Sequence, residues 1–273
     1  FGRISRYGAG VYGIPNDYVG PVTRTARDCG MVMQVVAGYD HRDPFSVSAP
    51  VPNYIDALDG DLKKIKVGIP NEHFWDYLDE EVEFAVRSAI SHLGELGCSI
   101  VEVSMPTMGV VNEIHTILSE AETAAFYQPQ MQHFIDETPG ILFQRIEKGS
   151  KVLAADYIRA RITRDQLNAE IEATFREVDI LLTPVSILPA PRIGRFEFKH
   201  GGKTWVIGDL ASRLTQPFNT SGHPAVSVPC GFTNSGLPIG LQLVAPNFGE
   251  AVLLKVADAY QRAAEQSIRW PSL

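Results

Sequence analysis

The feature that most constrains the fold is an apolar pattern over residues 66–103 whose period changes twice. Residues 66–70 (KVGIP) form a short apolar run, which predicts a buried strand. Apolar residues then recur at helical spacing up to Gly97, at Val82, Ala85, Val86, Ala89, Ile90, Leu93 and Leu96. Residues 99–103 (SIVEV) indicate a second strand. A strand, a helix and a strand in this order predict a parallel pair joined by a right-handed crossover.

Three further apolar runs predict strands that extend this pair. Residues 179–184 (DILLTP) are almost continuously apolar, as is typical of a strand covered on both faces. Residues 225–228 and 239–244 are separated by the turn signal Asn234-Ser235-Gly236, which predicts two strands joined by a tight turn. We therefore expect a layered α/β/α fold whose mixed sheet is largely parallel.

Helical spacing predicts the remaining elements. Helices are expected over residues 23–37, 108–149 (broken near Pro139-Gly140), 151–177 and 249–265. In the first of these, four residues form the apolar side, namely Met31, Val32, Val35 and Val36. Residues 186–207 contain Pro, Gly, Arg and Lys without any period, which predicts a long surface loop.

The bulk composition excludes several classes of function. The 273 residues are 45% hydrophobic and 21% charged, as in an ordinary globular protein, and the net charge is −8. A chain-wide basic surface is absent, so we expect no direct contact with nucleic acid. No apolar run approaches the length of a membrane span, so we expect no membrane contact. Cys29, Cys98 and Cys230 lie far apart, which favours free thiols in a reducing compartment and a cytoplasmic location.

Two patterns that resemble ligand sites are attributed to chance. Residues 8–13 (GAGVYG) match the dinucleotide fingerprint, but only seven residues precede them and Pro15 follows, so the required strand and helix do not fit. The seven histidines are scattered and do not form the convergent set that a metal needs. We therefore expect neither a cofactor nor a metal.

Two arginines lie among apolar residues and each allows two interpretations. Arg164 falls on the apolar stripe of the predicted helix 151–177, where it either makes a structural ion pair or orders the wall of a pocket. Arg145 is surrounded by Ile141, Leu142, Phe143 and Ile146. It either forms a plain ion pair or holds a substrate carboxylate through its bidentate fork.

Several segments, taken in order, resemble one enzyme family. Residues 17–28 contain DYVGPVTRT followed by Asp28. Further along the chain come Ala160-Arg161 with Arg164, and then the apolar run 179–184. Residues 217–232 (PFNTSGHPAVSVPCGF) and 236–246 (GLPIGLQLVAP) complete the series. Together they resemble the amidase signature family of serine amide hydrolases, and the resemblance implies an incomplete form of that family's fold.

The resemblance also implies which part of the enzyme this chain supplies. The family uses a Ser–Ser–Lys triad and a Gly/Ser-rich loop, and no such loop occurs in residues 1–273. We therefore expect residues 1–273 to be the C-terminal portion of a single amidase-signature domain, with the N-terminal catalytic portion absent and the chain inactive alone. No catalytic residue is assigned, and neither Ser221 nor Ser227 is expected to be the nucleophile. The residues expected to bind substrate are Thr183, Gln216, Asn219 and Arg145.

Three functions follow from the resemblance. The first is hydrolysis of a small carboxamide to an acid and ammonia or an amine. For this function the chain would associate with the missing N-terminal portion of the same protein, and the protein could form a homo-oligomer. The second is the A subunit of the glutamine-dependent amidotransferase that acts on misacylated tRNA. Residues 144–146 with Gly149 are compatible with it, but Ser212 stands where an acidic glutamine-binding residue is implied. The third is a non-catalytic scaffold of the same fold.

Overall fold

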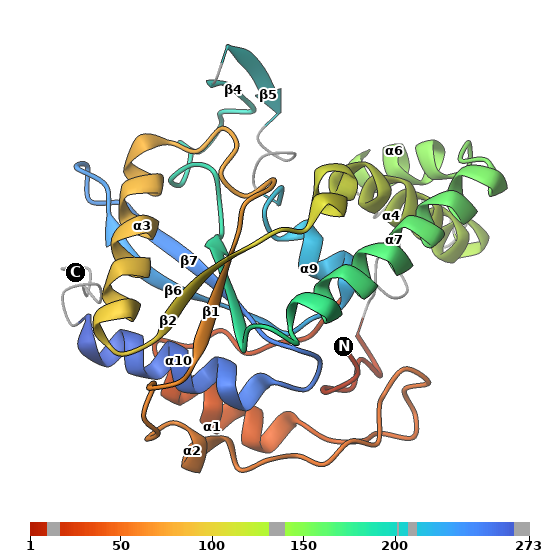
Figure 1. Ribbon diagram of the computed structural model, residues 1–273. Coiled ribbons are helices and arrows are strands. Elements are labelled where there is room, and N and C mark those ends of the chain that lie inside the picture. Colours follow the sequence, from red (N-terminus) through yellow and green to blue (C-terminus); the bar gives the residue numbers. More distant parts are fainter. Residues whose placement is uncertain (10–16, 131–139, 201, 207–211, 265–273) are drawn as a thin grey trace.

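A computed structural model describes residues 1–9, 17–130, 140–200, 202–206 and 212–264, so the glycine run at residues 8–13 lies mostly outside the described residues. A five-stranded sheet forms the centre of the molecule (Figure 1). Its strands follow the spatial order β2 (Ser99–Val103), β1 (Lys66–Pro70), β3 (Ile180–Pro184), β7 (Pro238–Val244) and β6 (Ala225–Phe232).

The sheet is mixed, as the sequence predicts. β1 pairs in parallel with both β2 and β3, whereas β7 pairs antiparallel with both β3 and β6. The pairings are thus divided evenly, where we expected a largely parallel sheet. The reason is the hairpin of β6 and β7, because strands joined by a tight turn must run antiparallel. All five residues of β3 are buried, in agreement with its continuously apolar sequence.

The crossover helix α3 (Glu80–Glu95) has the predicted apolar face. Asp79 caps its first turn by accepting a hydrogen bond from the backbone of Glu81 at 2.9 Å. Five apolar residues of the helix are buried, namely Val82, Ala85, Val86, Ala89 and Leu93. The closing helix α10 (Glu250–Ala263) lies beside α3, with the rings of Tyr260 and His92 5.9 Å apart, and both helices pack on β6 and β7.

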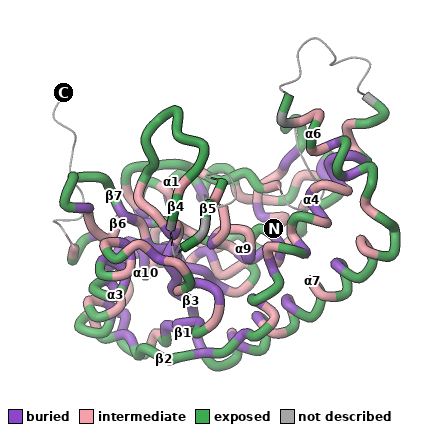
Figure 2. The backbone as a smooth tube through the Cα atoms, turned by 90° about the horizontal axis from the view of Figure 1, so that it is seen from above, coloured by how far each residue is buried: buried purple, intermediate pink, exposed green. Residues whose placement is uncertain are grey.

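A helical layer lies to one side of the sheet (Figure 1). It consists of α4 (Val111–Tyr127), α6 (Gly140–Gly149) and α7 (Ala154–Thr174), and α4 packs against the other two. The short helix α9 (Gln216–Ser221) lies between this layer and the sheet. Figure 2 shows that buried residues concentrate on the sheet and on the inner sides of the helices, which confirms the predicted α/β fold.

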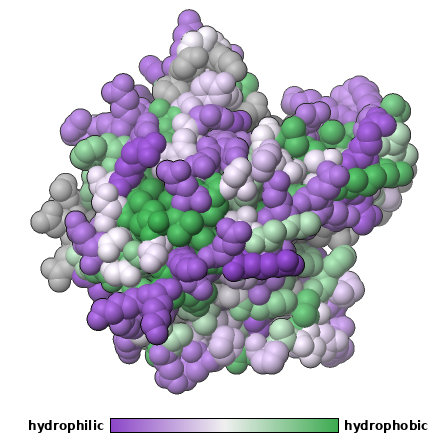
Figure 3. Space-filling model, viewed as in Figure 1, coloured by the Kyte–Doolittle hydropathy of each residue, from purple (hydrophilic) through white to green (hydrophobic). Residues whose placement is uncertain are grey.

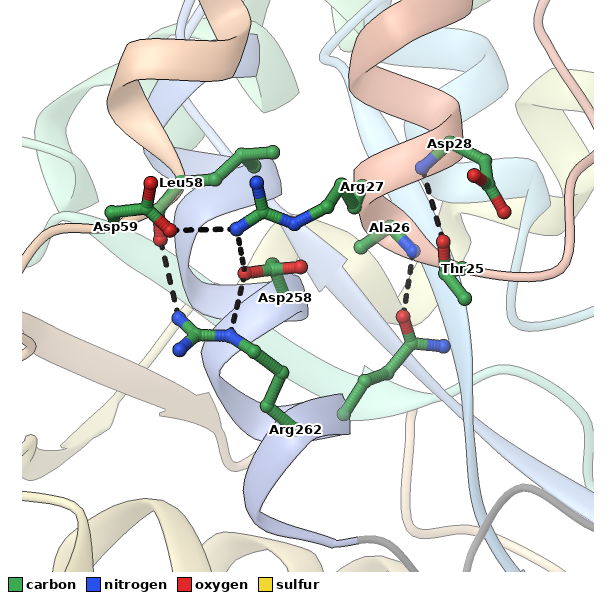
Figure 4. A network of polar contacts seen from close by, with 9 residues as sticks. Thr25, Ala26, Arg27, Asp28, Leu58, Asp59, Asp258 and Arg262 are labelled. Atoms are coloured by element: carbon green, nitrogen blue, oxygen red, sulfur yellow. Dashed lines mark hydrogen bonds and ion pairs between the residues drawn. The ribbon is translucent and has the colours of Figure 1, made fainter.

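Polar contacts fasten α1 (Ala26–Val36) to α10 (Figure 4). The guanidinium of Arg27 lies 2.6 Å from Asp59 and 3.4 Å from Asp258, and Arg262 contacts Asp258 at 2.8 Å. The backbone amide of Ala26 donates to Gln261 at 2.6 Å. These contacts hold the start of α1 in place and direct its buried side towards α10 and α2 (Tyr54–Ala57).

The apolar side predicted for α1 is exposed in the structure. The exposed fraction is 50% for Met31 and 83% for Val35. The buried residues of this helix are instead Ala26, Gly30 and Met33. A side chain at Gly30 would meet Leu58 and Leu254 at van der Waals distance, so α10 and α2 pack on the small-residue side of α1. None of the described residues covers the opposite, apolar side.

A β-hairpin replaces part of the long loop that we expected over residues 186–207. It consists of β4 (Glu197–His200) and β5 (Lys203–Val206) and projects from the body of the molecule (Figure 1). The ring of Trp205 packs edge-on against Tyr77 at 5.1 Å, which anchors the hairpin to the loop after β1. Because this contact joins distant parts of the chain, no local pattern reveals it.

The face shown in Figure 3 is largely hydrophilic, with a cluster of apolar side chains near its middle and further apolar residues at the upper right. Within the part of the chain that the structure describes, no helix combines the length and the apolar composition that a bilayer crossing requires. The three cysteines, Cys29, Cys98 and Cys230, are free thiols.

Candidate functional site

A cavity of about 1000 Å³ opens along β6. Its walls come from the N-terminal arm (residues 1–4, 6 and 18–25), from α1, from α9, from the β6–β7 hairpin and from α10. The residues that matter below are Tyr18, Asn219, His223, Ser227 and Gln242, all of which line it. The family-like segment 217–232 therefore forms one wall of the cavity.

A polar stripe on α4 faces the elements around this cavity. Its residues recur at helical spacing and so share one face of the helix, namely Asn112, His115, Ser119 and Glu122. Asn112 donates to the side chain of Gln216 and to the carbonyl oxygen of Arg213. Nδ1 of His115 lies 2.9 Å from the hydroxyl of Thr220. The stripe thus holds α9 at both of its ends.

Arg145 on α6 contacts the middle of the stripe. Its guanidinium donates to the hydroxyl of Ser119 at 3.3 Å. Among the described residues, no carboxylate lies within ion-pair distance of Arg145, so the plain ion pair that we considered does not form there. Burial, together with the charge of Arg145, lowers the pKa of His115 to about 4. His115 is therefore neutral at pH 7, and Arg145 is the positive charge of this cluster.

The four expected substrate-binding residues occupy different layers. Asn219 is exposed into the cavity, and its backbone oxygen accepts a hydrogen bond from the hydroxyl of Tyr18 at 2.6 Å. Gln216, three residues earlier on α9, bonds to Ser212 at 2.9 Å and to Asn112. Gln216 and Arg145 both contact the polar stripe of α4, through Asn112 and Ser119 respectively. Asn219 lies on the same short helix as Gln216.

Thr183 lies one layer behind the cavity. Its side chain has no exposed surface, and its hydroxyl accepts a hydrogen bond from Gln242 at 3.0 Å. Gln242 also donates to the carbonyl oxygen of Leu214 at 3.1 Å and itself lines the cavity. Thr183 is therefore placed to orient Gln242, a residue that the sequence analysis did not single out.

Glu122 and Arg164 form a second buried polar group, between α4 and α7. The side chain of Arg164 is 15% exposed and its guanidinium lies 3.6 Å from Asp165, while its Nε is buried without a hydrogen-bond partner. Burial raises the pKa of Glu122 to about 7, although the hydrogen bond from Tyr157 at 3.2 Å and the charge of Arg164 oppose the shift. Helical spacing from Asn112 could have identified Glu122.

The loop after β1 packs against Arg213, in the segment that leads into α9. His73 and Tyr77 have φ values of 72° and 62°, which non-glycine residues rarely adopt. Nε2 of His73 lies 3.2 Å from the carbonyl oxygen of Arg213, and the guanidinium of Arg213 lies 5.8 Å from the centre of the Tyr77 ring. Sequence patterns gave no signal for these contacts. Among the described residues no group of three His, Cys, Asp or Glu side chains is arranged to hold a metal ion.

Comparison with known proteins places these features in a family. The family model described as Amidase matches residues 1–254. The A subunit of glutamyl-tRNA(Gln) amidotransferase from Chloroflexus aggregans is 37% identical over 100% of this chain, and that from a Synechococcus strain is 35% identical over 97% of it. In both cases the chain spans 59% of the relative's own length.

Solved structures show the same architecture. The A subunit of the Thermotoga maritima glutamyl-tRNA(Gln) amidotransferase matches 96% of this chain with a TM-score of 0.80 and 25% identity, and the match covers 56% of that protein. A bacterial aryl acylamidase of the amidase signature family matches with a TM-score of 0.82 and 22% identity, over 96% of this chain and 56% of its own. The latter, at its low identity, supports the fold alone.

Proposed function

The chain belongs to the amidase family, and on this premise we propose that it is the C-terminal portion of a Ser–Ser–Lys amide hydrolase. The reaction is cleavage of a small carboxamide to an acid and ammonia or an amine. The observation that carries the proposal is the cavity along β6, because one of its walls is the family-like segment 217–232. In this account the chain supplies the substrate pocket and the N-terminal portion of the same protein supplies the nucleophile.

Ser221 and Ser227 do not provide an alternative nucleophile. A weak serine nucleophile needs both an adjacent base and access to the substrate. Ser221 is bonded to His223, a base, but it does not line the cavity. Ser227 lines the cavity on β6, but among the described residues no histidine or lysine is bonded to its hydroxyl. The family's two triad serines and its lysine are therefore assigned to the N-terminal portion.

The geometry of β6 and α1 suits such a partner. Among the described strands β6 pairs only with β7, so its other edge is open, and this edge borders the cavity. An open strand edge offers unpaired backbone groups to a further strand. The apolar side of α1 also lacks a cover, as the exposure of Met31 and Val35 shows. We assign both surfaces to contacts with the N-terminal portion, and a second copy of the chain is the competing occupant.

The polar cluster suggests how a substrate is held. Asn219 is exposed and lines the cavity, and we assign its side-chain amide to a contact with the substrate. Arg145 does not line this cavity. It faces a neutral hydroxyl and a neutral histidine on α4, so its charge is available for a carbonyl or carboxylate oxygen of a substrate that extends to α4. Gln216 and Thr183 act behind these groups, through Asn112 and Gln242 respectively.

A second function is favoured by the relatives. The Chloroflexus and Synechococcus proteins bear the name of the A subunit of glutamyl-tRNA(Gln) amidotransferase. Against that function stands Ser212, which occupies the place where the family resemblance implies an acidic glutamine-binding residue. In the structure its hydroxyl accepts a hydrogen bond from Gln216 at 2.9 Å, so the position holds α9 and carries no negative charge. We therefore rank direct amide hydrolysis first and a non-catalytic scaffold last.

The full-length protein is expected to hydrolyse small aliphatic or aryl amides faster than glutamine. The physical reason is the missing negative charge at Ser212, which leaves the ammonium group of glutamine without a partner. Release of ammonia or amine from a panel of amides and from glutamine measures this preference. S212D is the matched variant, and it should raise the activity on glutamine relative to the amides. Glutamine hydrolysis that exceeds all amides and rises with tRNA and a partner protein would establish the amidotransferase function instead.

A further inference from the structure

A buried histidine links the C-terminal end of α9 to α7. The side chain of His223 is 1% exposed, and its Nε2 lies 3.1 Å from a carboxylate oxygen of Glu172. Its Nδ1 lies 3.0 Å from the hydroxyl of Ser221. Asn247, in the loop after β7, donates to the same oxygen of Glu172 at 2.9 Å, and the ring of Phe175 lies 5.5 Å from the imidazole. The imidazole is thus held on several sides.

The partners determine which nitrogen of His223 carries the proton. A carboxylate only accepts hydrogen bonds, so Nε2 carries the proton that is donated to Glu172. Nδ1 is then an acceptor for the hydroxyl of Ser221. Burial lowers the pKa of His223, which agrees with a neutral ring at pH 7. We refer to this arrangement of Glu172, His223 and Ser221 as the α9 tie.

The order serine, histidine, carboxylate resembles that of an activated nucleophile, but the position of the serine does not fit that role. Ser221 is not among the residues that line the cavity, whereas His223 and Asn219 are. A nucleophile must reach the reacting carbonyl, so we assign the tie a different role.

The role follows from the short length of α9. A helix of six residues gains little stability from its own hydrogen bonds, so contacts at its ends must hold it. At its C-terminal end the chain turns at Gly222, whose φ is 87°, and His223 follows at once. Asn219, three residues before the turn, is exposed and lines the cavity. A shift of the turn therefore moves Asn219 relative to a substrate.

We propose that His223 is a positioning residue: held by Glu172 and Ser221, it fixes the Gly222 turn and thereby sets where Asn219 lies in the cavity. The proposal rests on the proposed function, because it takes Asn219 to contact the substrate. It assigns no reacting atom to His223.

The first test is H223F in the full-length protein. Phenylalanine keeps the packing against Phe175 but removes both hydrogen bonds. Loss of a substrate contact that is equal in the ground and transition states raises KM, so we expect KM to rise roughly tenfold while kcat stays within about twofold. The control is H92F. His92 also pairs with a glutamate, Glu95 at 3.3 Å, but it lies on α3 and does not line the cavity. H92F should leave KM unchanged.

The second test concerns Glu172. E172Q retains an oxygen that accepts from Nε2 of His223 and is expected to keep KM near the wild-type value. E172A removes it and should raise KM as much as H223F does. The double variant E172A/H223F should have the same KM as either single variant, because each single change already breaks the α9 tie. An unchanged KM in H223F, an equal rise in H92F, or additive effects of E172A and H223F would overturn the proposal.

A readout without activity separates the tie from the proposed function. Nitrogen-15 NMR of the histidine rings at pH 7 should show His223 as the Nε2–H tautomer in the wild type and in E172Q. The Nδ1–H tautomer or a protonated ring would refute the tie. If the wild-type full-length protein hydrolyses no amide, the proposed function fails, and the KM prediction with it. The NMR result still decides whether His223 is held as described.

Discussion

Replacing Gly149 with alanine is expected to lower the free energy of unfolding by more than about 3 kcal/mol. Gly149 ends α6 where that helix meets α4. A Cβ atom there would lie 1.9 Å from the backbone oxygen of Glu120 and 2.9 Å from Cβ of Ala124. Neither atom can rotate away, so the two helices must separate. The higher helix propensity of alanine recovers at most about 1 kcal/mol.

The consequence extends to the candidate site, because α6 carries Arg145. Separation of α6 from α4 would break the 3.3 Å contact between Arg145 and Ser119. Urea denaturation followed by circular dichroism measures the loss of stability. The matched control is G140A, since Gly140 begins the same helix and a Cβ atom there would meet nothing within 4 Å. A G149A protein as stable as G140A would show that α4 and α6 do not approach as closely as described.

Replacing Glu122 with glutamine is expected to stabilise the protein at pH 8 and to leave its stability nearly unchanged at pH 4. The pKa of Glu122 is raised to about 7 by burial, from an ordinary value near 4.5. The folded protein therefore holds a proton that the unfolded chain releases. The stability due to this proton is complete below pH 4.5 and is lost as the pH rises through 7. The loss reaches about 3 kcal/mol at most, and glutamine, which does not ionise, avoids it.

The measurement is the difference in unfolding free energy between E122Q and the wild type at the two pH values. E113Q is the control, since Glu113 is an exposed residue of the same helix. Glutamine also retains an oxygen that accepts the hydrogen bond from Tyr157. Destabilisation by E122Q at pH 8 would contradict this prediction, because it would mean that folding stabilises the ionised carboxylate of Glu122, through Arg164, instead of penalising it.

The elements with a regular period were predictable from the sequence. The spacing from Val82 to Leu93 and the apolar run of β3 specify burial locally, and the structure has both as expected. The β4–β5 hairpin was not predictable, because its anchor is the contact between Trp205 and Tyr77, which are far apart in the sequence. The exposed side of α1 was misjudged for a similar reason. Its buried side is selected by Gly30, whose small size admits α10.

The candidate site was predictable only in part. Asn219 belongs to the family-like segment 217–232 and Gln216 directly precedes it, and both lie on α9. The contact between Arg145 and Ser119 depends on the distance between α6 and α4, and this distance cannot be predicted from the sequence of the two helices. The proton on Glu122 depends on burial between two helices. Such properties arise from tertiary packing, and no periodicity encodes them.

The division of labour between the two portions is tested by measuring amide hydrolysis by residues 1–273 alone and by the same chain mixed with the separately expressed N-terminal portion of the protein. We expect no turnover by residues 1–273 alone and turnover by the mixture, with a serine-directed covalent probe labelling only the N-terminal portion. Turnover by residues 1–273 alone, or probe labelling of Ser221 or Ser227, would contradict the claim that this chain supplies the pocket and its partner the nucleophile.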